Sequence, residues 1–148
     1  MKIKVKKLRD NAILPTRGSE FAAGYDVTAA IDEPVVISPR NTVKIGTGLA
    51  FELPNDYFMD VRPRSGLATK YGIRPANTPG TCDSDYRGEY IVALHNDSRS
   101  PYTVQPGERI AQLILQQFTP MTFEEVDELT ESKRGTGGFG STDKKKEK

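Results

Sequence analysis

The strongest candidates for chemistry lie in one turn-rich stretch of the sequence, residues 77–88, which reads NTPGTCDSDYRG. It contains Asp83, Asp85 and Tyr86 and is followed by the apolar run of residues 91–94. This pattern predicts a hairpin that presents its acidic groups at the tip or the root. The alternative is a solvent-exposed turn rich in aspartate and glycine. An EF-hand calcium loop is excluded because the required later glycine and glutamate are missing.

A second segment, residues 62–68 with the sequence RPRSGLA, carries groups that bind anions. Arg64, the Ser65 hydroxyl and the flexible backbone at Gly66 open a short predicted helical turn, which suits a phosphate. In the alternative interpretation, Ser65 only caps that helix.

A third segment, residues 134–142, reads RGTGGFGST. Its glycines allow several backbone N–H groups to converge on phosphate oxygens, and Arg134, Ser141 and Thr142 add donors. It is not a Walker A loop, since no Gly-Lys-Ser/Thr follows the glycines. The alternative is a plain flexible tail, in which Phe139 is unusual unless its ring stacks on something flat.

Polar residues in two further segments complete the set of candidates. Asp26 lies in AAGYDV, residues 22–27, where a simple bend entering a strand is the plainer interpretation. Arg109 and Gln112 begin the otherwise apolar RIAQLIL. A buried Gln112 needs a hydrogen-bond partner, and satisfaction within the core is the default explanation.

The composition limits which chemistry these residues can perform. The 148 residues include 21 Lys and Arg against 20 Asp and Glu, a formal charge of +1, which excludes a broadly basic nucleic-acid-binding protein. One Cys and one His exclude an internal disulfide, a zinc site of three or four N/S ligands and catalysis by several histidines. Carboxylates, hydroxyls, Arg, Lys and backbone amides remain, with Mg²⁺ or Ca²⁺ as the natural metals. We expect His95 to be structural or exposed and Cys82 not to act as a nucleophile.

The sequence gives no sign of a membrane or export segment. The N-terminal MKIKVKK alternates charge and lacks the apolar core of a signal peptide, and the apolar runs are too short to span a bilayer. We therefore expect a soluble, intracellular protein.

Many short segments with period-two alternation must position these candidates, and turn signals separate them. Predicted strands cover residues 2–6, 35–37, 42–45, 49–53, 57–61, 89–94, 102–104, 109–118 and 122–126. The pattern predicts an all-β sandwich or barrel. One short helix is expected over residues 65–71, confined by Gly66 and Gly72. We assign residues 1–130 to the barrel domain and residues 131–148 to a flexible Gly-rich arm that ends in solvated KKKEK.

Taken in order, the five segments around Asp26, Arg64, Asp83, Gln112 and Arg134 closely resemble the five motifs of the homotrimeric dUTPase family. The resemblance covers about residues 14–142 and is most specific over residues 80–88 and 134–142. Cys82 is one departure, because the family usually has an aliphatic residue there.

The resemblance implies a jelly-roll-like β-barrel and a homotrimer whose three active sites are shared between subunits. It implies hydrolysis of dUTP to dUMP and pyrophosphate with Mg²⁺ held mainly by the triphosphate, which limits uracil in DNA and supplies dUMP for dTMP synthesis. It also implies a cytoplasmic enzyme, or a nuclear one if the source is eukaryotic or viral, that contacts neither nucleic acid nor membrane.

The resemblance also assigns roles to residues. Asp83 is the general base that activates the attacking water, Tyr86 packs under the deoxyribose and rejects a 2′-hydroxyl, and Asp26 engages Mg²⁺ through water. The remaining substrate-binding positions are Arg64, Ser65, Gly66 and Gln112 for the phosphates, Asn77, Gly80, Thr81, Cys82 and Ile91 for uracil, and Arg134, Phe139, Gly140, Ser141 and Thr142 in the arm.

Two alternatives compete with this assignment. A dCTP deaminase shares the barrel and phosphate residues but needs a different acid/base arrangement around the base. A non-catalytic trimeric β-domain would bind nucleotide or protein without turnover. The intact Asp83, Tyr86 and arm argue against both.

Overall fold

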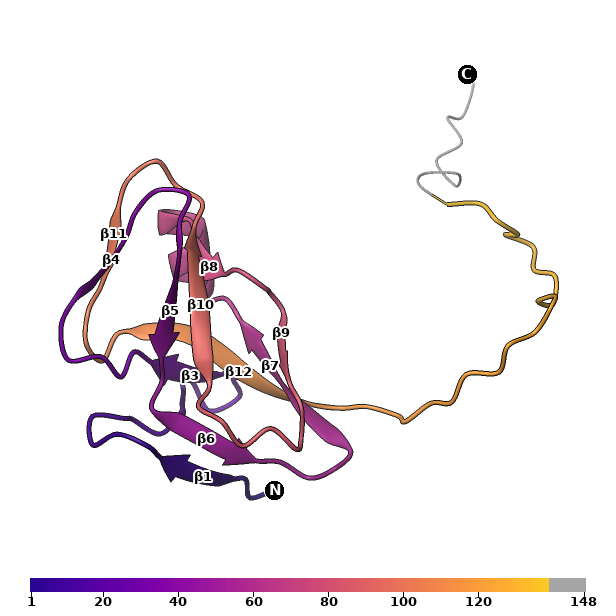
Figure 1. Cartoon of the computed structure of the whole chain (residues 1–148), viewed down its shortest axis with the longest axis horizontal. Helices are drawn as coiled ribbons and strands as arrows, with labels where there is room; N and C mark the ends of the chain where they lie inside the picture. The colour runs from indigo at the N-terminus through magenta and orange to yellow at the C-terminus, as the bar shows by residue number, and fades with distance from the viewer. Residues whose placement is uncertain (139–148) are drawn as a thin grey trace.

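The computed structural model describes residues 1–138, which contain twelve strands and one short helix (Figure 1). The elements are β1 (Lys4–Lys7), β2 (Thr16–Arg17), β3 (Tyr25–Thr28), β4 (Val35–Ile37), β5 (Thr42–Gly46), β6 (Leu49–Glu52), β7 (Tyr57–Arg62), η1 (Leu67–Tyr71), β8 (Ile73–Pro75), β9 (Gly80–Cys82), β10 (Ile91–Asn96), β11 (Tyr102–Val104) and β12 (Arg109–Gln117). The prediction of an all-β fold is confirmed.

The strands pair antiparallel in four groups that wrap around one core. The largest has the order β2-β3-β12-β7-β9, and a three-stranded sheet has the order β5-β10-β8. Two-stranded pairs, β1 with β6 and β4 with β11, close the sides. Many neighbouring strands are far apart in sequence, and β12 joins the segments around Asp26 and Arg62 directly.

Alternation of apolar and polar residues explains which face of each strand is buried. In β10, Val92 and Leu94 are buried whereas Ile91 is exposed. The fully buried side chains come from many strands, so the core is continuous rather than split. They include Val27, Ile37, Ile45, Leu49, Ile73, Leu94, Val104 and Ile110.

Most predicted elements are confirmed to within one or two residues, including the helix. It is a single π-type turn, and Gly72 ends it in the left-handed conformation (φ 69°), with its N–H bonded to the carbonyls of Leu67 and Ala68. The strand β3 was expected only as a strand that follows the bend before Asp26, without bounds, and the strands β2, β8 and β9 were not foreseen. These last three have two or three residues each, and Pro75 and Gly80 in two of them are poor strand formers.

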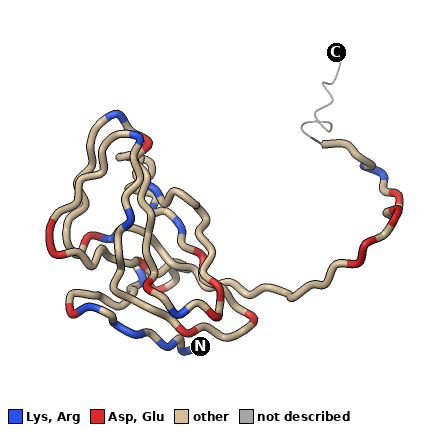
Figure 2. The backbone as a smooth tube through the Cα atoms, viewed as in Figure 1, with Lys and Arg blue, Asp and Glu red and all other residues tan. Residues whose placement is uncertain are grey.

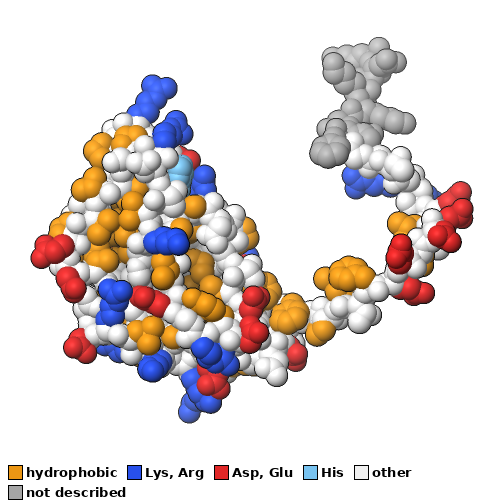
Figure 3. All heavy atoms as spheres, in the orientation of Figure 1, with side chains coloured by type: hydrophobic (Ala, Val, Ile, Leu, Met, Phe, Trp, Pro, Cys, Tyr) orange, Lys and Arg blue, Asp and Glu red, His pale blue; other side chains and the backbone are white. Residues whose placement is uncertain are grey.

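The chain leaves the barrel after Phe118, whose N–H donates to the Asp56 carbonyl at 3.0 Å (Figure 1). The predicted strand over residues 122–126 is therefore wrong for this chain: the segment, TFEEV, pairs with no strand among residues 1–138. Acidic residues follow one another along it (Figure 2), and apolar side chains are exposed on it (Figure 3). Phe123 is 90% exposed and Leu129 87%. Segment 119–130 thus lies outside the barrel, although the sequence assigned it to that domain.

Within residues 1–138 no helix has the length and apolar character needed to cross a membrane.

Candidate functional site

Asp26 on β3 lies between two arginine side chains. Its Oδ1 accepts a hydrogen bond from Arg64 Nε and its Oδ2 from Arg109 Nη1, both at 3.1 Å. The Asp26 side chain is only 14% exposed, so these charge-assisted bonds are partly shielded from water. Arg64 Nη1 also contacts the Arg109 carbonyl at 3.4 Å. Among residues 1–138, Arg64 Nη2 then has no hydrogen-bond partner and is left to bind an anion.

A β-bulge places Arg109 beside Asp26. The register of β12 against β3 shifts between Arg109 and Ala111, so that Arg109 is opposite Thr28 and Gln112 opposite Asp26. Such a bulge re-aims the side chains around it. The sequence identified Arg109 as a polar residue but did not assign it to the site. The register shift beside Arg109 could not be foreseen, because the alternation of apolar and polar residues along a strand does not reveal a bulge.

Gln112 fixes the turn that carries Arg64. Its Nε2 donates to the Pro63 carbonyl at 2.9 Å, and its Oε1 packs against Gly24, where an added Cβ would lie 2.1 Å away. Gln112 thus has an internal partner, as the default interpretation expected. Gly24 belongs to the site because any side chain there would displace this amide, and the sequence did not foresee that contact.

Ser65 and Gly66 begin the helical turn and are exposed. No side chain caps the helix, and the Ser65 carbonyl accepts from the Thr69 hydroxyl at 2.7 Å. The interpretation of Ser65 as a simple helix cap is therefore not supported. Its hydroxyl stays available to a ligand, next to Arg64.

A second group of predicted residues surrounds β9. Asp83 follows this strand directly, is exposed, and has no hydrogen-bond partner for its carboxylate among residues 1–138. Its backbone carbonyl accepts from Tyr86 N–H at 3.2 Å, which closes a turn. Asn77 folds over Gly80, with its Nδ2 3.2 Å from where a Cβ on the glycine would stand.

Tyr86 covers one side of that turn and is 44% exposed. Its hydroxyl donates to the Glu89 carbonyl at 3.1 Å. Gly88 lies under the ring, and a Cβ there would be 2.4 Å from the Tyr86 hydroxyl. Ile91, the first residue of β10, is half exposed. Thr81 and Cys82 pair with β7, so the predicted uracil-binding residues come from adjoining segments.

Within the two groups, Asp83 and Arg64 lie toward opposite ends of β7. Cys82, next to Asp83, pairs with Met59, whereas Arg64 follows the other end of the strand. Met59 and Arg64 are five residues apart, about 16 Å if the chain is extended, and β7 covers the first part of that distance. One chain therefore does not bring Asp83 to the anion-binding turn.

Residues 131–138 of the arm reach neither group in this chain. Arg134 Nε donates to the Gly137 carbonyl at 2.8 Å within the arm itself. Phe139, Gly140, Ser141 and Thr142 lie outside the described residues.

The remaining ionisable candidates behave as expected. Burial raises the pKa of the Cys82 thiol, which keeps it protonated and a poor nucleophile. His95 Nδ1 lies 2.8 Å from the Thr42 hydroxyl, a structural contact between β10 and β5. Residues 1–138 hold no group of three or more His, Cys, Asp and Glu side chains that would bind a metal unaided.

This combination defines a class of protein: an all-β barrel with an arginine-centred anion site on one loop and an unpartnered carboxylate on another. The family within that class follows from a match of residues 10–143 to the dUTPase family model. The chain belongs to the dUTPase family.

Relatives cover nearly the whole chain. It is 48% identical over 144 residues to the deoxyuridine 5′-triphosphate nucleotidohydrolase of Nautilia profundicola, covering 97% of this chain and 100% of the relative. It is 45% identical over 141 residues to the enzyme of the same name from Rickettsia felis, covering 95% of each.

Solved structures agree on the fold. A mutant dUTPase of Staphylococcus bacteriophage 80alpha, in complex with dUpNHpp, has a TM-score of 0.86 and 27% identity, covering 95% of this chain and 98% of that one. The dUTPase of phage phi11 of S. aureus, described with a structural Mg(II) ion, has a TM-score of 0.80 and 23% identity, covering 88% of this chain and 100% of that one. This second similarity shows the fold alone. The expected jelly-roll-like fold of the dUTPase family is confirmed.

Proposed function

We propose that this protein hydrolyses dUTP to dUMP and pyrophosphate with Asp83 as the general base. The observation that carries this proposal is the exposed Asp83 carboxylate, which has no partner among residues 1–138 and follows a rigid strand. The family and its close relatives support the same reaction. We place the enzyme in the cytoplasm.

The phosphate chain binds at the turn after β7. Arg64 offers Nη2, Ser65 its hydroxyl and Gly66 its backbone N–H, while Asp26 and Arg109 keep the guanidinium in place. A pre-oriented donor set needs no rearrangement when negative charge develops during phosphoryl transfer. Gln112 contributes by holding the Pro63 carbonyl, and therefore the turn.

At the second group, Asp83 accepts a proton from a water that attacks the α-phosphorus in line with the leaving pyrophosphate. The proton moves to the Asp83 carboxylate, and the bond to the bridging oxygen breaks. The Tyr86 ring covers the deoxyribose and leaves no room for a 2′-hydroxyl. Asn77, Ile91 and the backbone of residues 80–82 read the uracil edge, where a narrow slot excludes a 5-methyl group.

Mg²⁺ fits these residues as a cation that arrives with the triphosphate. The Asp26 carboxylate is already shared by two guanidinium groups, which favours contact with the ion through water rather than direct ligation. When bound, the ion neutralises phosphate charge and polarises the reacting phosphoryl group.

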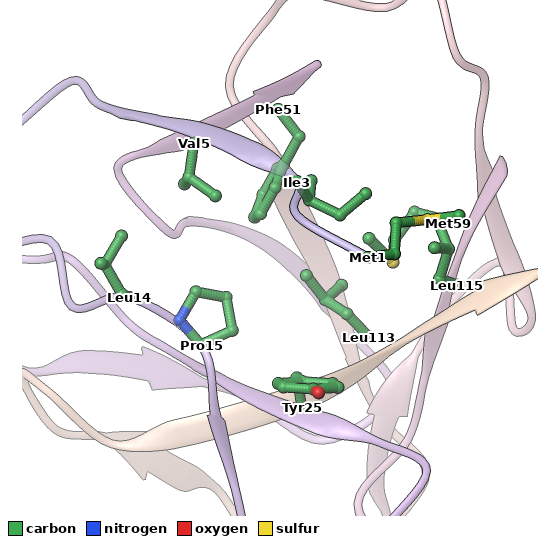
Figure 4. Close-up of a pocket in the computed structure, with 10 residues that line it drawn as sticks. All are labelled: Met1, Ile3, Val5, Leu14, Pro15, Tyr25, Phe51, Met59, Leu113 and Leu115. Carbon is green, nitrogen blue, oxygen red and sulfur yellow. The ribbon is translucent and has the colours of Figure 1, made fainter. Parts of the chain in front are cut away.

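Two observations support a homotrimer with shared sites. Asp83 and Arg64 lie toward opposite ends of β7 within one chain, an arrangement that suits a site assembled from two subunits. An apolar pocket of about 480 Å³ also opens beside β1, lined by Ile3, Val5, Phe51 and others (Figure 4). A surface of this kind marks an interaction site.

The exposed segment 119–131 of a second copy suits that pocket. It carries apolar side chains, Met121 and Phe123 among them, and five acidic residues without a single Lys or Arg. The strand β1 that borders the pocket carries three exposed lysines, Lys4, Lys6 and Lys7 (Figure 2). Charge and apolar surface are therefore complementary, and docking would carry the arm to a neighbouring active site.

The arm acts as a lid in this proposal. Arg134, Ser141 and Thr142 close over the γ-phosphate, Gly140 allows close approach, and Phe139 stacks on uracil. Closure excludes water other than the nucleophile.

The decisive assay compares four nucleotides with Mg²⁺ present. We expect pyrophosphate release from dUTP and little from dCTP, dTTP or UTP. Ammonia release from dCTP would instead identify a deaminase, and no reaction with any of the four would favour a binding module.

A single substitution tests the base. Asp83→Asn should lower kcat by at least roughly 10²-fold, the usual scale of general-base catalysis. Binding of dUTP, measured by calorimetry, should persist because the Asn side chain retains the shape. Near-normal turnover would remove Asp83 from this role, and Asp85→Asn on the same turn is the matched control.

A further inference from the structure

Three aromatic rings form a row that runs from the core to Tyr86. Phe51 on β6 is 4% exposed and its ring centroid lies 4.4 Å from that of Tyr90, with an interplanar angle of 48°. Tyr90 is 3% exposed, and its centroid lies 6.0 Å from that of the half-exposed Tyr86, at 34°. Tyr90 is thus the buried ring on which Tyr86 rests.

The backbone of Tyr90 is fixed against the start of β6. Its N–H donates to the Leu49 carbonyl at 2.8 Å, and its carbonyl accepts from the Thr47 hydroxyl at 2.7 Å. The preceding Glu89 accepts from Gly48 N–H through Oε1 at 2.8 Å. Tyr90 therefore cannot shift without breaking several bonds.

Tyr86 has fewer restraints than the ring beneath it. Its hydroxyl donates to the Glu89 carbonyl, and Gly88 limits its approach on one side. Nothing else among the described residues stacks on its ring, so the second support is Tyr90.

The ring of Tyr90 matters here rather than its hydroxyl. The hydroxyl is buried and makes no regular hydrogen bond within residues 1–138, although the Cys82 thiol neighbours it. A buried hydroxyl without a partner destabilises a fold. The hydroxyl therefore adds little stability, whereas the ring packs between Phe51 and Tyr86. The small Cys82 side chain leaves space for that ring.

We propose that Tyr90 is a positioning residue for substrate selection. Its ring packs on Phe51 and keeps the Tyr86 ring where it leaves room for a deoxyribose but not for the 2′-hydroxyl of a ribose. The proposal rests on the role of Tyr86 proposed above. Tyr90 itself touches no substrate and acts only through Tyr86.

The test compares the selectivity of variants, defined as kcat/KM for dUTP divided by kcat/KM for UTP. Tyr90→Leu removes the stack and should lower this ratio by roughly 2- to 10-fold, the range that an aromatic pair contributes. Tyr90→Phe keeps the ring and should keep the ratio at the wild-type value. Tyr90→Met fills the space without a ring and gives the same readout if Tyr90→Leu does not fold.

A matched control separates selectivity from stability. Tyr102 packs on Tyr71, with ring centroids 5.4 Å apart, and β11 lies at the other end of the β5–β10 pair (Figure 1). Tyr102→Leu also removes one aromatic pair, so it should lower the melting temperature but leave the ratio unchanged. If Tyr90→Leu and Tyr90→Met behave in the same way, Tyr90 is merely structural and the proposal fails.

Failure of the proposed function gives different results. Tyr86→Ala with wild-type selectivity would refute the sugar-recognition role of Tyr86. Wild-type protein that releases no pyrophosphate from dUTP would refute the reaction itself. Failure of the Tyr90 proposal alone would look different. Tyr90→Leu would then be active with wild-type selectivity, while Tyr86→Ala would lose selectivity.

Discussion

The separation of Asp83 from Arg64 along β7 predicts that two inactive variants restore activity when they assemble together. Asp83→Asn removes the base, and Arg64→Gln removes the phosphate ligand but keeps a polar side chain. Each variant alone should form an inactive homotrimer. In mixed trimers, a site that takes Asp83 from one chain and Arg64 from another can receive both intact residues.

The size of the effect follows from random assembly. In an equal mixture, a site has a one-half chance of an intact Arg64 and an independent one-half chance of an intact Asp83. Roughly one quarter of the sites should therefore be functional when the two residues come from different subunits. If both residues came from one chain, no site would contain both, and the mixture would stay inactive.

Co-expression with two different affinity tags yields the mixed trimers, and pyrophosphate release from dUTP measures the active fraction. Wild type mixed equally with the Asp83→Asn, Arg64→Gln double variant is the control. It should retain roughly one quarter of wild-type activity with shared sites and one half with sites inside single chains. If the mixture of single variants is inactive and the control keeps one half of wild-type activity, Asp83 and Arg64 of one site come from the same chain, and the inference of shared sites is refuted.

Three further predictions concern other parts of the site. Gly24→Ala should collide with Gln112 Oε1 and lower the unfolding free energy by about 1–3 kcal/mol, measured by urea denaturation, with a matching loss of kcat/KM. An unchanged stability would show that Gln112 moves freely. Because burial raises the pKa of the Cys82 thiol, iodoacetamide should alkylate it more slowly at pH 8 than free cysteine, with a rate that climbs above pH 9. Fast alkylation at pH 8 would mean an exposed thiolate. Truncation after residue 130 should spare cooperative unfolding but abolish turnover, whereas loss of folding would make the arm structural.

The sequence was most informative where a local pattern determines the structure. Strands such as β4 and β11 were predicted correctly because alternation and flanking turns are local signals. The short helix after Arg64 followed from its two glycines. The candidates around Asp26 and Arg64 were grouped only through the family resemblance, since nothing local links strands so distant in sequence.

The errors arose where distant segments determine the structure. Strand β9 forms because β7 supplies its partner, and its sequence GTC gives no strand signal. Residues 122–126 were predicted as a strand, but no neighbouring strand is present to pair with them among residues 1–138. Arg109 contacts Asp26 from a strand distant in sequence, beside a register shift in β12. Strand formation is thus decided by a pairing edge, which a single-sequence pattern does not describe.

The arrangement of charge explains how a chain of formal charge +1 can bind a polyanion. Asp26 lies between Arg64 and Arg109, so the cluster keeps one net positive charge while the two guanidinium groups are held apart. Without that carboxylate the arginines would repel each other, and Arg64 would lose its fixed orientation. Asp26 therefore strengthens the anion site because it holds the Arg64 guanidinium in a fixed orientation. Counting charges over the whole chain hides this effect, because affinity for phosphate depends on which donors face the ligand.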